Sequence, residues 1–153
     1  MKDRFLSRGK RIDNGEWVCG NYVHTRKDDY FIYDHDYGVN VDVDPDTVCQ
    51  CTGITDKNNR LIFEGDIVKL ETAAIFSEPE YIVPYRPSPV KKSDINFDVI
   101  GTVVWNHVFW DIKFNKYDDY VFENFMWSAK RDDSLEIIGN STDNPELKEG
   151  EAK

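Results

Sequence analysis

Short runs of aromatic and β-branched residues, separated by turn-forming residues, constrain the fold of this chain more than any other feature. The strongest example is Asn14-Gly15, which stands between the extended runs 4–12 and 16–23. Both residues tolerate the positive φ angles of a type I′ turn, so the dipeptide predicts a β-hairpin. We therefore expect a mainly β protein, of β-rich α+β class, that opens with a hairpin or meander.

The same pattern continues along the chain. Strands are expected at 30–33, 39–43 and 47–53, with a turn at 56–59. The bend at Gly65-Asp66 followed by an apolar strand is typical of the entry into a small, strongly bent β-barrel. The nearly continuous apolar run Val99–Trp105 predicts a strand buried on both faces, and residues 108–115 alternate as a partner strand after a turn at Asn106-His107. A last strand is expected at 135–138, and a short helix or turn begins at 144–147.

Residues 71–97 break this pattern. They contain four prolines and several aromatic residues with weak periodicity. Loops of this length are usually functional or disordered, so Tyr81 and Tyr85 are candidate contact residues. The segment 120–125 fits either a strand or a turn of helix.

Charge is uneven along the chain. The net charge is −10, which disfavours a protein that grips nucleic acid broadly through phosphates. A basic N-terminal edge precedes an acidic stretch with seven aspartates between residues 28 and 46. Solvated faces of opposite sign are the simplest interpretation. The basic residues of the edge are Lys2, Arg4, Arg8, Lys10 and Arg11.

Cysteine use and hydropathy indicate a reducing compartment. Cys19, Cys49 and Cys51 are odd in number and too few for a disulfide scaffold. The first residues lack the apolar core of a secretory signal, and no apolar run is long enough to cross a bilayer. We expect a cytoplasmic protein.

Candidate metal sites are weak. Cys49-x-Cys51 puts two thiols on one face of a strand, but it lacks a second cysteine pair and the usual loop spacing for zinc. Asp42-x-Asp44-x-Asp46 resembles the start of a calcium loop, but Thr47 and Gly53 stand where glycine and glutamate are diagnostic. We expect no metal and no other cofactor.

Three blocks of the sequence resemble the YopX family. They cover about a third of the chain in the family's order: Arg8–Val18; Gln50, Thr52-Gly53, Asp56-Lys57-Asn58, Ile62 and Glu64–Val68; Ile137–Asn140 with Asn144–Leu147. Asn59 stands where the family usually has a turn glycine, Cys51 where an aromatic residue is common, and 71–97 has no recognised counterpart.

The resemblance implies a mainly β protein with a small barrel, carried by phages and prophages, without established catalytic residues or cofactor. It predicts one domain over residues 1–153. We expect a hairpin region at 1–60, a barrel at 61–147 that contains the inserted loop 71–97, and a frayed tail at 148–153. These blocks are interpreted as turns and strand entries, so the family signature is mainly a folding signature.

No catalytic set is visible in the sequence. The three histidines have no serine or cysteine motif beside them, and no phosphate loop or HExxH is present. We therefore expect that the protein is not an enzyme. Trp105 and Trp110 are expected to fill a core, whereas Tyr117 and Tyr120 lie among charged residues and are expected to be exposed.

Two binding hypotheses follow. The first is a phage-encoded accessory protein that acts through protein–protein contacts or homo-oligomer assembly, with the 71–97 loop and the tyrosines as contact surface. The alternative is nucleic-acid binding through Arg4, Arg8, Lys10 and Arg11 with Lys91 and Lys92.

Overall fold

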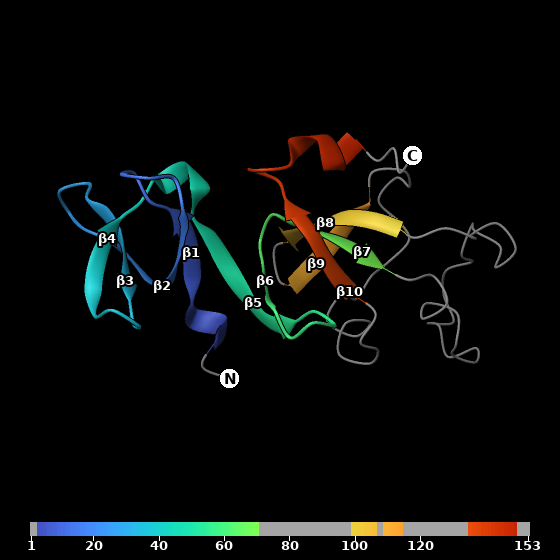
Figure 1. Cartoon of the computed structure of the whole chain (residues 1–153), viewed down its shortest axis with the longest axis horizontal. Coiled ribbons are helices and arrows are strands. Elements are labelled where there is room, and N and C mark those ends of the chain that lie inside the picture. Colours follow the sequence, from blue (N-terminus) through green and yellow to red (C-terminus); the bar gives the residue numbers. More distant parts are fainter. Residues whose placement is uncertain (1–2, 71–98, 107–108, 115–134, 150–153) are drawn as a thin grey trace, which may run out of the picture. The chain divides into compact units, whose positions relative to one another are not determined.

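The computed structural model describes residues 3–70, 99–106, 109–114 and 135–149, and these form two antiparallel sheets with short 3-10 helices (Figure 1). The strand orders are β4-β3-β2-β1-β5-β6 and β10-β7-β8-β9. This confirms the expected β-rich class. The chain divides into two compact units, one of Met1–Thr55 with Leu61–Gly65, the other of Asp56–Arg60 with Asp66–Lys153. A single domain over residues 1–153 stays a prediction.

The first unit is a meander of short strands. Its described elements are η1 (Asp3–Phe5), β1 (Ser7–Lys10), β2 (Trp17–His24), β3 (Tyr30–Asp34), β4 (Val39–Asp42), η2 (Pro45–Thr47), β5 (Cys49–Thr55) and β6 (Leu61–Phe63). Each strand from β1 to β4 pairs antiparallel with the next one, as the turn signals predict.

A left-handed residue closes each of four hairpin loops. Gly15, Asp28, Gly38 and Asn59 have φ angles of 73°, 60°, 67° and 61°. The prediction of a two-residue type I′ turn at Asn14-Gly15 is wrong. Only Gly15 has a positive φ, and the Gly15 N–H donates to the Arg11 carbonyl, so the loop begins before Asn14. Asn14 instead accepts a hydrogen bond from the Glu16 N–H through its side chain, which stabilises a longer loop.

The meander closes on itself. Arg11 bridges Val43, the Ile12 N–H donates to the Asp42 carbonyl at 3.1 Å, and the Asp44 N–H donates to the Lys10 carbonyl at 2.9 Å. These bonds join the end of β1 to the end of β4, so the four strands enclose the buried side chains of Val18, Ile32 and Val43. This closure is partial, because among the described residues a single bridge, between Arg11 and Val43, joins the two ends, and β4 remains an edge of the six-stranded sheet.

Two glycines make room for this core. A Cβ on Gly9 would lie 3.2 Å from Val43 Cβ and 3.3 Å from Ile32 Cδ1. A Cβ on Gly20 would lie 2.0 Å from the Tyr33 carbonyl oxygen. Gly20 is the last β2 residue that pairs with β1, and Asn21 is the first that pairs with β3. The close approach of two backbones at this switch requires glycine.

The second unit contains the other sheet. Its described elements are β7 (Asp66–Leu70), β8 (Val99–Asn106), β9 (Phe109–Phe114), β10 (Leu135–Asn140) and η4 (Pro145–Glu149). β8 and β9 pair up to Asn106 opposite Phe109, and β10 pairs with β7. Among the described strands, pairing runs from β10 to β9 without closure, so a barrel in this unit stays a prediction.

Burial along β8 differs from the expectation. Gly101 and Val103 are buried, but Thr102 and Val104 are only half-buried, so one face of the strand packs and the strand is not buried on both faces. Trp110 is 7% exposed, which confirms its place in the core. Trp105 is 49% exposed and makes an edge contact with Trp110 at 4.9 Å between ring centroids, so the prediction that Trp105 fills the core is wrong.

Several expectations lie outside the described residues. They are the loop 71–97, the ambiguous segment 120–125 and the end of the tail at 150–153; Lys148 and Glu149 of the expected tail belong to η4. In the described part of the chain, no helix has the length and apolar character needed to span a membrane.

Candidate functional site

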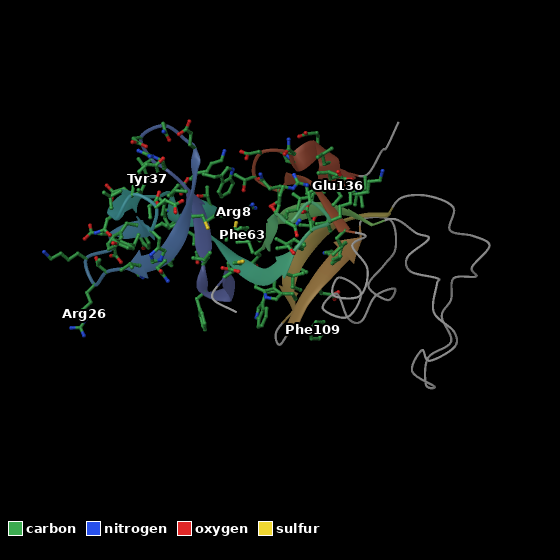
Figure 2. All side chains as sticks on the ribbon, turned by 60° about the horizontal axis from the view of Figure 1, so that its bottom comes forward. Arg8, Arg26, Tyr37, Phe63, Phe109 and Glu136 are labelled. Atoms are coloured by element: carbon green, nitrogen blue, oxygen red, sulfur yellow. The ribbon has the colours of Figure 1, made fainter. Side chains whose placement is uncertain are left out.

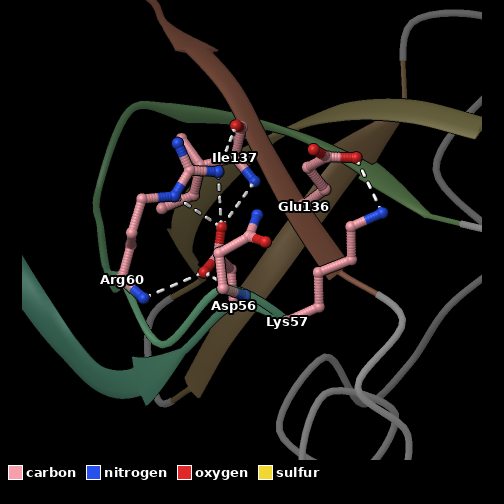
Figure 3. A network of polar contacts seen from close by, with 6 residues as sticks. Asp56, Lys57, Arg60, Glu136 and Ile137 are labelled. Atoms are coloured by element: carbon pink, nitrogen blue, oxygen red, sulfur yellow. Dashed lines mark hydrogen bonds and ion pairs between the residues drawn. The ribbon is translucent and has the colours of Figure 1, made fainter.

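The Asp56 carboxylate is a buried polar centre in the second unit (Figure 3). It accepts five hydrogen bonds: from the backbone N–H groups of Asn58, Arg60 and Ile137, and twice from the Arg60 guanidinium, at 2.9 and 2.6 Å. Its side chain is fully buried, whereas that of Arg60 is half-exposed. Every acceptor position is used for structure, so this carboxylate is not available for chemistry.

Electrostatics follow this geometry. Desolvation acts to raise the pKa of Asp56, but the hydrogen bonds from Arg60, Ile137 and Asn58 outweigh it and hold the pKa below its ordinary value. Beside it, Lys57 pairs with Glu136 at 2.8 Å and the Lys57 N–H donates to the Leu135 carbonyl. The turn at 56–60 is thereby fastened to β10.

The other characteristic positions of the resemblance also have structural roles. The Thr52 hydroxyl donates to the Ile62 carbonyl at 2.8 Å, and Gly53 takes a φ of 78° where the register of β5 and β6 shifts. A Cβ on Gly139 would lie 2.7 Å from Asn144 Oδ1, and that oxygen accepts from the Asn140 N–H. These contacts support the interpretation of the three blocks as a folding signature.

The outer face of the meander carries partly exposed aromatic and apolar side chains. It is the side of β2 and β3 opposite Val18 and Ile32, and the register places Asn21 across from Tyr33 and Val23 across from Phe31. Val23 and Tyr33 are 36% and 39% exposed. We define the outer face as Trp17, Cys19, Asn21, Val23, Phe31 and Tyr33.

Two basic side chains of β1, Arg8 and Lys10, lie over aromatic rings at one side of the outer face. The Arg8 guanidinium lies 4.8 Å from the Phe63 ring (Figure 2). It also lies 4.7 Å from the Trp17 ring, and Lys10 Nζ lies 5.6 Å from the same ring. Cation–π contacts of this kind hold Arg8 and Lys10 on the same side of β1. Strand alternation in the sequence puts Trp17, Cys19 and Val23 on one face, but no binding role was assigned to Trp17 or Phe63, and the predicted two-residue turn would have paired Lys10 with Cys19 instead of Trp17.

The predicted basic edge is therefore divided. Arg11 faces away from Arg8 along the strand and binds Asp13 through two hydrogen bonds, at 2.9 and 2.7 Å. Arg4 lies in η1. Tyr81, Tyr85, Lys91, Lys92, Tyr117 and Tyr120 lie outside the described residues.

Most aspartates of the acidic stretch lie at exposed positions of the first unit. Asp28, Asp29 and Asp36 are exposed in loops, and Asp42 is exposed on β4. Asp44 accepts from the Asp46 N–H and caps η2, so the pattern that resembled a calcium loop forms a helix cap.

The cysteines do not form a reactive centre. Cys51 is buried and Cys49 half-buried, and the Cys49 thiol donates to the Thr47 carbonyl. Desolvation, together with the neighbouring Cys51, raises the pKa of the Cys19 thiol to about 11. In the described residues, no group of three or more His, Cys, Asp or Glu side chains is arranged to hold a metal ion.

A family model covers nearly the whole chain. The model, described as YopX protein, matches residues 6–149. No curated protein matches the chain. The chain is similar to the crystal structure of protein EF1440 from Enterococcus faecalis, with 18% identity, a TM-score of 0.46 and coverage of 93% of this chain and 96% of that one. Since the family model spans residues 6–149, this protein belongs to the YopX family.

Proposed function

We propose that this protein is a phage-encoded accessory protein of the bacterial cytoplasm that acts by binding another protein, or a second copy of itself, without catalysis. The observation that carries the proposal is the outer face of the meander. Aromatic and apolar side chains there, Val23 and Tyr33 above all, are left partly exposed. Exposed apolar side chains gathered on a rigid sheet are typical of protein contact surfaces.

Charge supports a protein partner. The net charge of −10 repels polyanions, while the exposed aspartates around the meander attract a partner with basic residues. The described histidines support a role without catalysis. His24 stacks on Tyr30 and pairs with Asp28, and His35 is hydrogen-bonded to Asn21. Each is exposed and held in a loop or strand contact.

Paired variants test the proposal. The outer-face variant Val23→Ser/Tyr33→Ser removes exposed apolar area without changing charge. The control Ile12→Ser/Tyr37→Ser removes similar side chains, 68% and 81% exposed, from loops outside that face. Sedimentation velocity between about 5 and 500 µM measures self-association, and capture from a lysate of phage-infected host cells measures partner binding.

The proposal predicts that the outer-face variant loses the oligomer or the captured partner and that the control keeps it. A monomer at every concentration that captures no protein contradicts the proposal. If the wild type, the outer-face variant and the control capture the same partner equally well, the partner does not bind through the outer face.

One observation favours the alternative, nucleic-acid binding. Arg8 and Lys10 both lie over the ring of Trp17, and an indole beside two cations is a surface on which a nucleic-acid base stacks. It predicts salt-dependent retention on single-stranded DNA or RNA, with a shallower salt slope in Lys10→Ala. Lys10 is the better probe, because Arg8 also packs between two rings. Absence of retention at low salt removes this alternative.

A further inference from the structure

The dipeptide Asn14-Gly15, in the loop between β1 and β2, is reactive by composition alone. Asn14 is the only asparagine of the chain that a glycine follows. The main-chain nitrogen after an asparagine attacks the asparagine side chain most readily when it belongs to glycine, because glycine has no Cβ to obstruct the approach. In an unfolded chain of this sequence, Asn14 is therefore the asparagine most prone to spontaneous deamidation.

The reaction needs only these two residues and water. The Gly15 nitrogen forms a bond to Cγ of Asn14, the bond between Cγ and Nδ2 breaks, and Nδ2 leaves as ammonia with the proton of the Gly15 N–H. Water then opens the resulting cyclic imide at either of its carbonyl carbons. The products are aspartate and isoaspartate, whose main chain is one carbon longer. Nothing is oxidised or reduced, so no further co-reactant is required.

The folded loop occupies both reacting groups. The Gly15 N–H donates to the Arg11 carbonyl at 3.0 Å, so the attacking nitrogen is engaged in a main-chain hydrogen bond. Glu16 holds both polar atoms of the Asn14 side chain: its N–H donates to Oδ1, and its Oε2 accepts from Nδ2, each at 2.9 Å. Attack requires the Gly15 nitrogen to be released and the Asn14 side chain to turn away from Glu16, so these three hydrogen bonds oppose it.

Further bonds fix the two ends of the same loop. The Arg11 N–H donates to the Glu16 carbonyl at 2.9 Å, and the Ile12 N–H donates to the Asp42 carbonyl at 3.1 Å. The side chains of residues 12–16 are exposed, so the loop opens locally at a lower free-energy cost than unfolding of the whole meander. Opening of the loop 11–16 is thus the step that releases the Asn14-Gly15 dipeptide.

We infer that Asn14 is a self-modification site gated by the fold: it deamidates when the loop 11–16 opens or the chain unfolds, and it is protected while the loop keeps its hydrogen bonds. The change is irreversible. Aspartate at position 14 lacks the Nδ2 donor and adds a carboxylate beside Glu16, and isoaspartate lengthens the main chain between β1 and β2. Each product therefore opposes the return of the loop to its folded form. The inference does not depend on what the outer face binds.

The test compares the full chain with a peptide of residues 11–17 that is blocked at both ends. Mass spectrometry of proteolytic fragments follows deamidation of Asn14, and NMR follows amide hydrogen exchange at Gly15. Deamidation in the folded chain should be at least about tenfold slower than in the peptide. This slowing should be no smaller than the protection of the Gly15 amide from exchange, because the same opening releases the nitrogen for both reactions. In concentrated urea the full chain should react at the peptide's rate.

A pair of variants separates the loop contacts from folding in general. Glu16→Ala removes the acceptor of the Asn14 Nδ2 bond and keeps the main-chain bonds, so it should speed deamidation of the folded chain about threefold. Ile12→Ser changes an exposed side chain of the same loop that makes none of these bonds, and it should leave the rate unchanged. Both variants should match the wild type in concentrated urea.

Three results would each overturn the inference. The first is deamidation of the folded chain at the peptide's rate. The second is a slowing of deamidation smaller than the exchange protection at Gly15, because Asn14 would then react without opening of the loop. The third is a Glu16→Ala variant that reacts no faster than Ile12→Ser, because the hydrogen bonds of Asn14 would then not protect it.

Discussion

Ile137 donates its backbone N–H to Oδ2 of Asp56 at 3.2 Å, although 81 positions separate the two residues in sequence. Arg60 completes the link, because its guanidinium binds Asp56 and also donates to the Ile137 carbonyl at 2.6 Å. The central and C-terminal blocks that resemble the YopX family thus meet at one buried carboxylate. Much of what makes the family recognisable in this chain is the fastening of a turn to a strand.

Replacing Asp56 should be costly. Asp56→Asn removes the negative charge that backbone N–H donors and a guanidinium surround, and leaves Arg60 without its ion pair. Loss of one partner from a buried charged network costs about 2–4 kcal/mol, and the half-exposed Arg60 keeps the value away from the upper limit. Urea unfolding measures this. Asp13→Asn, which breaks the exposed pair with Arg11, is the matched control and should cost less than about 1 kcal/mol. Equal effects of the two variants would refute a structural role for the buried network.

Acid should remove the Asp56 contribution. Because the folded-state pKa lies below the unfolded value of about 3.9, the stabilisation is complete above that pH and is lost as pH falls through the folded pKa. The difference in unfolding free energy between wild type and Asp56→Asn should therefore be constant from about pH 7 to 5 and shrink below about pH 4. A difference that stays constant down to about pH 2.5 contradicts the pairing.

The left-handed Asn59 should accept glycine. At a φ of 61°, Asn59→Gly relieves the Cβ contact of the left-handed region and should raise stability by a few tenths to about 1 kcal/mol, offset in part by the greater freedom of the unfolded chain. Asn59→Val should destabilise by more than about 1 kcal/mol, since β-branched residues tolerate this region poorly. Thermal unfolding of both variants checks the order, and a valine variant as stable as wild type would show that the loop takes another conformation.

Gly20 should not tolerate a side chain. A Cβ at 2.0 Å from the Tyr33 carbonyl oxygen forces β2 and β3 apart, so Gly20→Ala should cost about 3 kcal/mol or more. Gly9→Ala meets side-chain carbons at 3.2 Å or more and should cost less. Gly15→Ala, where a Cβ meets nothing within 4 Å, should cost about 1 kcal/mol through its φ alone. Chemical denaturation measures the loss of unfolding free energy in the three variants. If Gly20→Ala costs no more than Gly9→Ala and Gly15→Ala, the close approach of β2 and β3 is contradicted.

The Cys19 thiol should be slow to alkylate. A pKa of about 11 lowers its thiolate fraction near pH 8 about a hundredfold relative to a thiol of pKa 9.0, and the greater nucleophilicity of a basic thiolate recovers part of this. Iodoacetamide labelling followed by mass spectrometry should show Cys19 reacting about tenfold more slowly than a short unstructured peptide that contains cysteine. Because Cys19 is an exposed residue, labelling at the peptide's rate would show that the pKa of its thiol is not raised.

Local signals in the sequence were sufficient for most strands of the first unit, because short aromatic and β-branched runs alternate with turn residues such as Asn14-Gly15 and 56–59. The closure of the meander was missed, since it depends on the bridge between Arg11 and Val43, which lie far apart in sequence and have no periodic signature. Trp105 was misassigned because an apolar run does not reveal which end of a strand the neighbouring strands leave uncovered.

The site was harder to predict than the fold. Arg8, Lys10 and Arg11 look like one basic edge in sequence, but strand alternation and the loop aspartate Asp13 separate Arg11 from the other two. Strand alternation alone places Trp17, Cys19 and Val23 on one face of their strand, but only the pairing register adds Tyr33 to the same side.

The most direct test of binding through the outer face is a side-chain footprint of the tagged chain by hydroxyl radicals in lysate from phage-infected host cells, compared with the purified chain in buffer. Binding through the outer face predicts that labelling of Val23, Phe31 and Tyr33 falls several-fold in the lysate, while labelling of the loop residue Tyr37 is unchanged. Equal labelling of Val23 and Tyr33 in lysate and buffer would contradict binding through the outer face.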